Sequence, residues 1–215
     1  MESIYGNYKG VLEGVSSKIT EIIIENSNEN YEKNQIKLFE HISSRIKSEE
    51  SMREKCIRKG FAETTESAIS QMRDAIGIRV VSSFVDDVFK NVELLKSIEN
   101  VEIEKEKDYI KHAKPNGYRS YHVILHVLPD FIYEDEEGKS VRLGDVMTEY
   151  DGVYAEIQLR TIAMDSWAAL EHQMKYKKDI AAHELIESEL KRVADELASC
   201  DLSMQTIREL IKSAK

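Results

Sequence analysis

Residues 44–60, SRIKSEESMREKCIRKG, place cationic and hydroxyl side chains at the end of an expected strand and along the helix after it. These side chains are Arg45 and Lys47 on the strand and Ser51, Lys55 and Arg58 on one helix face. Arginine can grip phosphate oxygens in a forked geometry and lysine adds a compact charge, so the strip suits a triphosphate. A solvated helix face with Glu/Lys pairs is the alternative that this stretch alone leaves open.

A second stretch, MRDAIGIRVV at residues 72–81, combines one carboxylate with one guanidinium. Asp74 is predicted at a helix end, and Arg79 is predicted to point out of a strand that begins at Gly77. An aspartate there can hold Mg²⁺, which takes oxygen ligands and bridges substrate phosphates. The alternative is a surface ion pair between Asp74 and Arg73 or Arg79.

The third stretch, KPNGYRSYH at residues 114–122, is a turn that leads into a strand. Pro115, Asn116 and Gly117 form the turn, which presents Lys114, Tyr118, Arg119 and His122 near one another. A fixed phenol ring can stack on a nucleobase, worth roughly 1–3 kcal/mol, while the cations meet phosphate or ribose. The alternative is that Tyr118 or Tyr121 is a core aromatic beside a tight turn.

The fourth stretch, residues 154–178, begins with a strictly alternating strand. Its polar face carries Tyr154, Glu156, Gln158 and Arg160. An open cleft is favoured over a buried polar network for this face, so Glu156 is a candidate second Mg²⁺ ligand and proton acceptor.

The helix after that strand is predicted to run from about Ala163 through Lys178. Trp167, Leu170 and Met174 are expected in the core, leaving Glu171, His172 and Lys175 on another side. His172 is equally consistent with a structural histidine.

The remaining elements must position these four stretches. Apolar spacing predicts a first helix ending near Glu25, where NSNENYEKN breaks it, then an extended segment over 36–47. Ser48 is a predicted N-cap and Gly60 a predicted helix end. Further helices are expected over 66–73 and 86–100, strands over 78–85, 101–105, 119–128 and 153–160, and an amphipathic segment around 186–197. This alternation predicts a sheet with helices packed on it.

Composition narrows the function classes. The net charge of −10 argues against general binding to nucleic acids or membrane surfaces, so any basic site must be local. Two cysteines are too few for a disulfide framework, and no segment approaches the roughly 20 apolar residues of a membrane span. The N-terminus also lacks the pattern of a signal peptide, so a cytoplasmic protein is expected.

The four stretches, in this order and spacing, resemble the synthetase domain of the RelA/SpoT family of nucleotide pyrophosphokinases, over roughly residues 36–178. The chain length is similar to that of the stand-alone small alarmone synthetases. The resemblance implies an α+β, nucleotidyltransferase-like fold: a mixed five-stranded sheet flanked by helices, with N- and C-terminal helices. The expected division of the chain is an N-terminal helix over 1–30, a synthetase domain over 31–178 and a C-terminal amphipathic helical segment over 179–215. The apolar stripe over 185–211 in this last segment indicates oligomerisation.

The activity implied is Mg²⁺-dependent transfer of the β,γ-diphosphate of ATP to the 3′-hydroxyl of GTP or GDP, with GMP a further acceptor to consider. AMP leaves and the alarmone pppGpp or ppGpp forms. The resemblance assigns Arg45, Lys47, Ser51, Lys55, Arg58 and Arg79 to ATP, and Asp74 and Glu156 to the metal and to catalysis. It assigns Lys107, Lys114, Asn116, Tyr118, His122, Gln158 and, more weakly, His172 to the guanine nucleotide.

The sequence departs from the larger family members in ways that narrow the expectation. No His is followed directly by Asp, the pair of the family's hydrolase domain, so synthesis without hydrolysis is expected. The long C-terminal regulatory region of the larger members is not found in this sequence, so no ribosome dependence is expected. Some of the stand-alone small alarmone synthetases are tetramers, so the resemblance implies a homotetramer. Two alternatives stay open: a nucleotidyltransferase that releases pyrophosphate, and a non-enzymatic module that binds nucleotide or single-stranded RNA, although RNA binding is not predicted.

Overall fold

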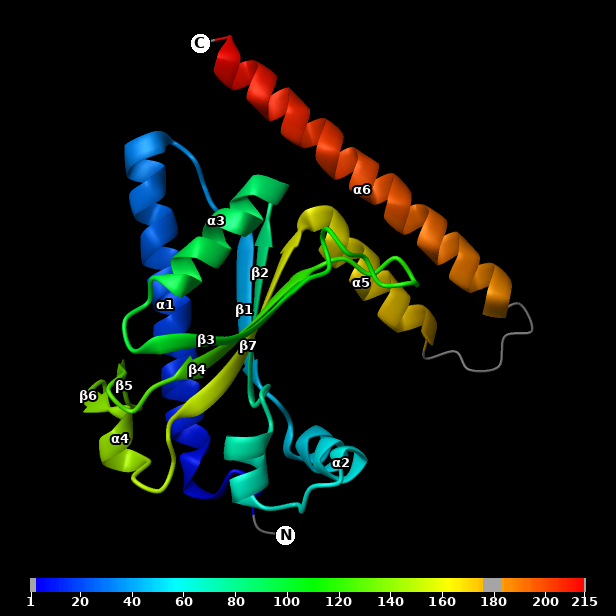
Figure 1. Cartoon of the computed structure of the whole chain (residues 1–215). Coiled ribbons are helices and arrows are strands. Elements are labelled where there is room, and N and C mark those ends of the chain that lie inside the picture. Colours follow the sequence, from blue (N-terminus) through cyan, green and yellow to red (C-terminus); the bar gives the residue numbers. More distant parts are fainter. Residues whose placement is uncertain (1–2, 176–182, 215) are drawn as a thin grey trace.

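The computed structural model describes residues 3–175 and 183–214, which form a mixed five-stranded sheet flanked by helices (Figure 1). The strand order is β1 (His41–Ile46), β2 (Ile76–Ser82), β7 (Val153–Thr161), β4 (Tyr121–Val127) and β3 (Val101–Asp108). Only the β2–β7 pair in this sheet is parallel. A separate hairpin pairs β5 (Ile132–Glu134) with β6 (Ser140–Arg142). The predicted α+β class is confirmed.

Helices flank this sheet. In chain order they are η1 (Gly6–Tyr8), α1 (Lys9–Asn34), α2 (Glu49–Lys59), the single π-turn η2 (Ser67–Gln71), α3 (Val85–Lys96), α4 (Leu143–Val146), α5 (Ile162–Lys175) and α6 (His183–Ser213). In Figure 1, α1 and α3 lie on one side of the sheet, whereas α5 continues from β7 on the other side and α6 runs past it. No helix within the two described ranges combines the length and apolar character needed to cross a bilayer.

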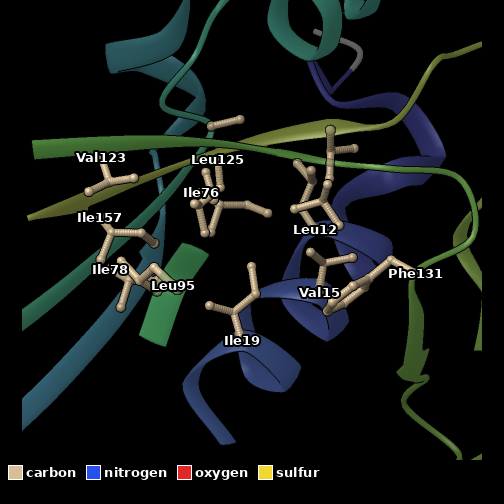
Figure 2. Packing of buried hydrophobic residues seen from close by; sticks show 14 of the residues in the cluster. Leu12, Val15, Ile19, Ile76, Ile78, Leu95, Val123, Leu125, Phe131 and Ile157 are labelled. Carbon is tan, nitrogen blue, oxygen red and sulfur yellow. The ribbon is translucent and has the colours of Figure 1, made fainter. Parts of the chain in front are cut away.

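The alternation of β7 separates a core face from a polar face. Ala155, Ile157 and Leu159 are fully buried, whereas Glu156 and Gln158 between them are half-buried. The apolar side chains join those of the neighbouring strands, α1 and α3 in one core, as Figure 2 shows for Ile76, Ile78, Leu125, Leu12, Val15, Ile19 and Leu95. Because the core occupies one face, the polar side chains of the inner strands are left to the other face.

The first helix is longer than the sequence indicates. The prediction that residues 26–34 break it is wrong, because α1 continues to Asn34 and ends at Gln35, which takes a left-handed conformation. The polar residues in this part bind the returning chain: the Ser27 hydroxyl accepts from the Leu38 amide, and Asn30 donates to the Ile36 carbonyl. These tertiary hydrogen bonds hold the last two turns in place despite their low helix propensity.

The elements around Asp74 differ partly from the prediction. Ser48 caps α2 by accepting from the Ser51 amide, and Gly60 ends this helix, as predicted. The helix predicted over 66–73 is only the π-turn η2, because the backbone becomes extended at Met72. Asp74 therefore lies in a short link before β2 and not at a helix end.

The outer part of α5 does not belong to the core. Trp167 is 2% exposed, as predicted, but Leu170 and Met174 are 48% and 44% exposed. The prediction for these two is wrong because α6 packs on the first half of α5, where Trp167 donates its indole N–H to the Leu190 carbonyl. The predicted end of this helix at Lys178 lies outside the described residues.

Candidate active site

Strand register places the predicted residues in two adjacent rows across the polar face of the sheet. In one row, Gln158 lies between Arg79 of β2 and His122 of β4, and Lys107 of β3 pairs with His122. In the next row, Glu156 pairs with Gly77, which pairs with Arg45 of β1. Residues that are distant in the sequence thereby share one face within a few strand widths.

A cleft of about 250 Å³ opens over these rows. Its lining consists of Ser43, Ser44, Arg45, Lys47, Asp74, Gly77, Ile78, Arg79, Glu156 and Gln158. Gly77 contributes no side chain, so the floor between Arg45 and Glu156 stays open. Four of the predicted ATP and metal residues therefore surround the same space as Glu156, and the prediction that Asp74 and Glu156 face one cleft is confirmed.

Asp74 is held between two lysines. Its Oδ2 accepts from Lys47 Nζ and from Lys55 Nζ, each at 2.6 Å. Burial alone would raise the pKa of Asp74, but the hydrogen bonds and charges of the two lysines outweigh it and lower this pKa. Asp74 is therefore a carboxylate at neutral pH, and it gathers two cations at the wall of the cleft.

Glu156 is the second carboxylate of the cleft. Burial raises the pKa of Glu156 and so does the charge of Asp74, but hydrogen bonds from His122 and Gln158 reverse the balance and lower it. His122 Nδ1 lies 3.1 Å from Glu156 Oε1, and Gln158 Nε2 lies 3.3 Å from Oε2. Glu156 is thus charged and held in place on both oxygens.

The oxygens of this pair suit a hard divalent cation. Asp74 Oδ1 is buried and has no hydrogen-bond partner among the residues that the structure describes. A buried carboxylate oxygen left without a donor is costly unless a ligand completes it. No group of three acidic, histidine or cysteine ligands gathers within residues 3–175 and 183–214. The two carboxylates fit Mg²⁺, which binds through one or two carboxylates plus substrate phosphates.

Tyr118 lies beside the cleft, half-buried, on the turn before β4. Its hydroxyl forms a hydrogen bond of 2.7 Å with His122 Nε2, so His122 links Tyr118 to Glu156. Lys114 Nζ lies 4.7 Å from the centre of the Tyr118 ring. Asn116 Oδ1 accepts from the Tyr118 amide and fixes the turn. The structure does not seal this ring in the interior.

Not every predicted site residue borders the cleft. The Ser51 hydroxyl is engaged with Ser48, and Arg58 is exposed in the last turn of α2. Lys107 is exposed on the edge strand β3, and His172 is exposed on α5. These four are not in the lining of the cleft, and neither are Lys55, Lys114, Asn116, Tyr118 and His122.

The structure adds groups to which the sequence assigned no role. Arg160 is buried on the polar face and donates to Tyr118, Gln158 and Asp165. Glu171 accepts from Asn116. The alternating pattern already placed Arg160 on the polar face, but nothing in the sequence showed that α5 and the turn at 114–119 would cover it.

A mixed sheet that carries two charged carboxylates, a cationic wall and a framed tyrosine on one face is the arrangement expected of the synthetase domain described above. The family model for the region found in RelA/SpoT proteins matches residues 44–181, and the chain belongs to this family.

Two relatives from Bacillus subtilis (strain 168) align over most of the chain. The GTP pyrophosphokinase YwaC is 38% identical over 202 residues, which cover 94% of this chain and 87% of that protein. The GTP pyrophosphokinase YjbM is 31% identical over 177 residues, which cover 82% of this chain and 75% of that protein.

Solved structures of small alarmone synthetases are similar to this chain in fold. Small alarmone synthetase 2 from Bacillus subtilis superposes with a TM-score of 0.70 at 35% identity, covering 94% of both chains. Small alarmone synthetase 1 from the same organism, bound to its product pppGpp, gives a TM-score of 0.69 at 27% identity and covers 91% of this chain and 92% of that one.

Proposed function

We propose that this chain is a GTP pyrophosphokinase that transfers the β,γ-diphosphate of ATP to the 3′-hydroxyl of GTP or GDP. The observation that carries the proposal is the single cleft in which Asp74, bound by two lysines, faces Glu156. The relatives named GTP pyrophosphokinase support the same reaction. Such a transfer needs positioning and charge neutralisation more than a covalent nucleophile.

The reaction breaks one phosphoanhydride bond. The 3′-hydroxyl oxygen attacks the β-phosphorus of ATP, the bond to the oxygen shared with the α-phosphate breaks, and AMP leaves with that oxygen. The hydroxyl proton passes to Glu156, which the lowered pKa keeps ready as a carboxylate. Gln158 and His122 hold that carboxylate toward the cleft.

The cations of the cleft are assigned to ATP in this proposal. Lys47 and Lys55, which both contact Asp74, would bind phosphate oxygens of ATP. The remaining ATP residues are Arg45, Ser51, Arg58 and Arg79, with Arg45 and Arg79 facing the adenine. Asp74 and Glu156 would hold Mg²⁺, which when bound neutralises charge on the phosphates.

The guanine nucleotide is assigned to the other end of the row. Tyr118 offers the ring on which guanine stacks, and Lys114 and His122 border it. The other assigned residues are Lys107, Asn116, Gln158 and His172. Base–aromatic stacking contributes roughly 1–3 kcal/mol, so the position of Tyr118 sets much of the acceptor affinity.

One assay tests the reaction. The protein is incubated with ATP, Mg²⁺ and GTP, GDP or GMP in turn, and the nucleotides are separated by anion-exchange chromatography. AMP and a 3′-diphosphorylated guanine product are expected in equal amounts. Pyrophosphate as the released product would instead establish nucleotidyl transfer, and the absence of any ATP-dependent product would reject both reactions.

We also propose that the protein synthesises the alarmone and does not hydrolyse it. The sequence lacks the His-Asp pair of the family's hydrolase. Incubation of purified ppGpp with the protein in Mn²⁺ or Mg²⁺ is expected to leave ppGpp intact for hours. Release of pyrophosphate from ppGpp would contradict this proposal.

Self-association is proposed for the C-terminal helix, with residues 1–30, 31–178 and 179–215 as N-terminal helix, synthetase domain and oligomerisation segment. Met204, Ile207, Leu210 and Ile211 on α6 are all more than half exposed. A contiguous apolar stripe of this kind marks an interaction site, and a second copy of the chain is the proposed occupant, as a homotetramer.

A further inference from the structure

Arg160 is the most enclosed cation on the polar face of the sheet, with 6% of its side chain exposed. Its Nη1 donates to Asp165 Oδ1 at 3.0 Å, and its Nη2 donates to the Tyr118 hydroxyl at 2.7 Å and to Gln158 Oε1 at 2.9 Å. A buried guanidinium is costly unless its donors are paired. Here the pairing reaches both the tyrosine and the glutamine that are assigned to the guanine nucleotide.

The chemistry of the guanidinium makes Arg160 a fixed donor. Its planar fork carries a delocalised positive charge and points its N–H groups in set directions. Its central carbon lies 5.2 Å from the centre of the Tyr118 ring. Arg160 therefore sets the position of the Tyr118 ring and hydroxyl together with the side-chain oxygen of Gln158.

Asp165, in the first turn of α5, is the counter-ion of Arg160, but it is shared. The same oxygen, Oδ1, lies 3.3 Å from Nη1 of Arg79, which borders the cleft. Arg79 is 43% exposed at its side chain, and its Nε is buried without a partner in the described part of the chain. One carboxylate oxygen thus joins an arginine of the ATP side to the arginine under Tyr118.

We propose that Asp165 and Arg160 are positioning residues that couple the two nucleotide sites. The inference rests on the proposed function for the assignment of Arg79 to ATP and of Tyr118 to guanine. When ATP binds Arg79 and displaces it from Asp165, Asp165 pairs with Arg160 alone. Arg160 is then more firmly fixed, and with it the positions of Tyr118 and Gln158. Binding of ATP raises the affinity for the guanine nucleotide, and by linkage the reverse holds equally.

Calorimetry tests this coupling without turnover. GDP is titrated into the full-length protein in Mg²⁺ buffer, with and without saturating α,β-methylene-ATP. In this analogue a methylene group replaces the oxygen between the α- and β-phosphates, so the transfer cannot take place. The expected result is a Kd for GDP that falls by about 5-fold or more when the analogue is present. In Asp165→Asn, the ratio of the two Kd values is expected to fall to within about 2-fold of unity, because the amide lacks the charge that the arginines share.

Two further variants separate positioning from general stability. Arg160→Lys keeps the charge but loses the fork, so the Kd for GDP is expected to rise about 10-fold while the Kd for the analogue alone stays within about 2-fold. Asp145→Asn is the matched control, because Asp145 pairs with Arg142 on the exposed surface and contacts neither site. Wild-type coupling is expected in this control.

The outcomes are distinguishable. GDP binding to the wild-type protein with no effect of the analogue, or coupling that persists in Asp165→Asn, overturns the inference and leaves the proposed function standing. Equal weakening of both ligands by Arg160→Lys overturns the positioning role. A wild-type protein that binds no guanine nucleotide overturns the proposed function and this inference together.

Discussion

Two carboxylates of the cleft keep their negative charge for different reasons. Asp74 is paired with lysines, whereas Glu156 is held by a histidine and an amide. In the proposed reaction, the lysines gathered by Asp74 bind phosphate, and Glu156 accepts a proton. At the scale of single residues, two similar carboxylates are thus proposed to have different roles because their hydrogen-bond partners differ.

Glu156→Gln tests the role of Glu156. The substitution removes the proton acceptor and one candidate metal oxygen while it keeps the size of the side chain. The turnover number is expected to fall by at least about 100-fold, within the range typical of a lost general base, with an unchanged melting temperature. Rates from the product assay and thermal unfolding are the measurements.

A matched control is Glu102→Gln on the exposed surface of β3, which is expected to keep full activity. If Glu156→Gln retained wild-type turnover, Glu156 would have no part in proton transfer.

At the scale of elements, the turn that carries Tyr118 is supported by α6. Gly117 has φ +91°, and a Cβ there would lie 2.6 Å from Ala194 Cβ. Arg119 donates to the Gly117 carbonyl, to the Ala194 carbonyl and to Asp195. The C-terminal helix is thus packed directly against the turn that carries Tyr118, the residue proposed to stack on guanine, and the position of α6 affects that of Tyr118.

Gly117→Ala is expected to be more harmful than the same change at Gly138, which has φ +75° and open space where the Cβ would lie. Left-handed strain costs about 1–2 kcal/mol at either position, but only at Gly117 is overpacking of about 1–3 kcal/mol added. Urea unfolding gives the stabilities, and GDP calorimetry shows whether the guanine site loosens with Gly117→Ala alone. Equal losses in the two variants would show that α6 does not press on the turn.

The contact between α6 and β7 gives a pH-dependent prediction. Asp201 accepts from the Thr161 hydroxyl at 2.6 Å, and burial raises the pKa of Asp201 despite this hydrogen bond and the charge of Arg119. A carboxyl with a raised folded-state pKa opposes folding where it is charged. That penalty is relieved as pH falls through the folded-state pKa toward the unfolded value of about 3.9.

Asp201→Asn keeps an acceptor for Thr161 and removes the charge. The melting temperature of the variant is therefore expected to exceed that of the wild type at pH 7, and the difference is expected to vanish by roughly pH 4. Thermal unfolding between pH 4 and 7 measures it. Asp130→Asn, a surface change, is the control, and a difference that did not depend on pH in Asp201→Asn would contradict the assignment.

At the scale of the whole molecule, the C-terminal end of α6 extends beyond α5 (Figure 1). This end carries apolar side chains that are exposed to solvent. Ile207 and Ile211 are 51% and 58% exposed, and they lie one turn apart on the same helix face. The same helix is fixed to α3 by Arg208, which pairs at 2.6 Å with the buried Asp87. Assembly through this face would therefore act on a helix that also supports the turn at Gly117.

The double change Ile207→Glu and Ile211→Glu is expected to reduce the solution mass from a multiple of 24.7 kDa to that of the monomer. Charges on the stripe would be desolvated in any helix–helix contact, which is unfavourable. Light scattering coupled to size exclusion measures the mass. Ile57→Glu, at an equally exposed position on α2, serves as the control and is expected to keep the wild-type mass. A wild-type protein with the mass of the monomer would contradict the proposed self-association.

The sequence by itself determined the class of fold, the family and six of the residues that line the cleft, namely Arg45, Lys47, Asp74, Arg79, Glu156 and Gln158. Periodicity fixes which face of a strand is apolar, so the polar face of β7 was readable from residues 154–160. Local signals were equally sufficient for the Ser48 cap and the end of α2 at Gly60, because both depend only on neighbouring residues.

Tertiary structure alone decided the features that depend on contacts between distant segments. The last turns of α1 persist because Ser27 and Asn30 bind the returning chain. The helix predicted over 66–73 is reduced to η2 because the backbone is extended at Met72. Leu170 and Met174 are exposed, whereas Trp167, which meets α6 at Leu190, is buried. The enclosure of Arg160 by β4, β7 and α5 likewise required the fold, since no local pattern encodes which segments will meet around one side chain.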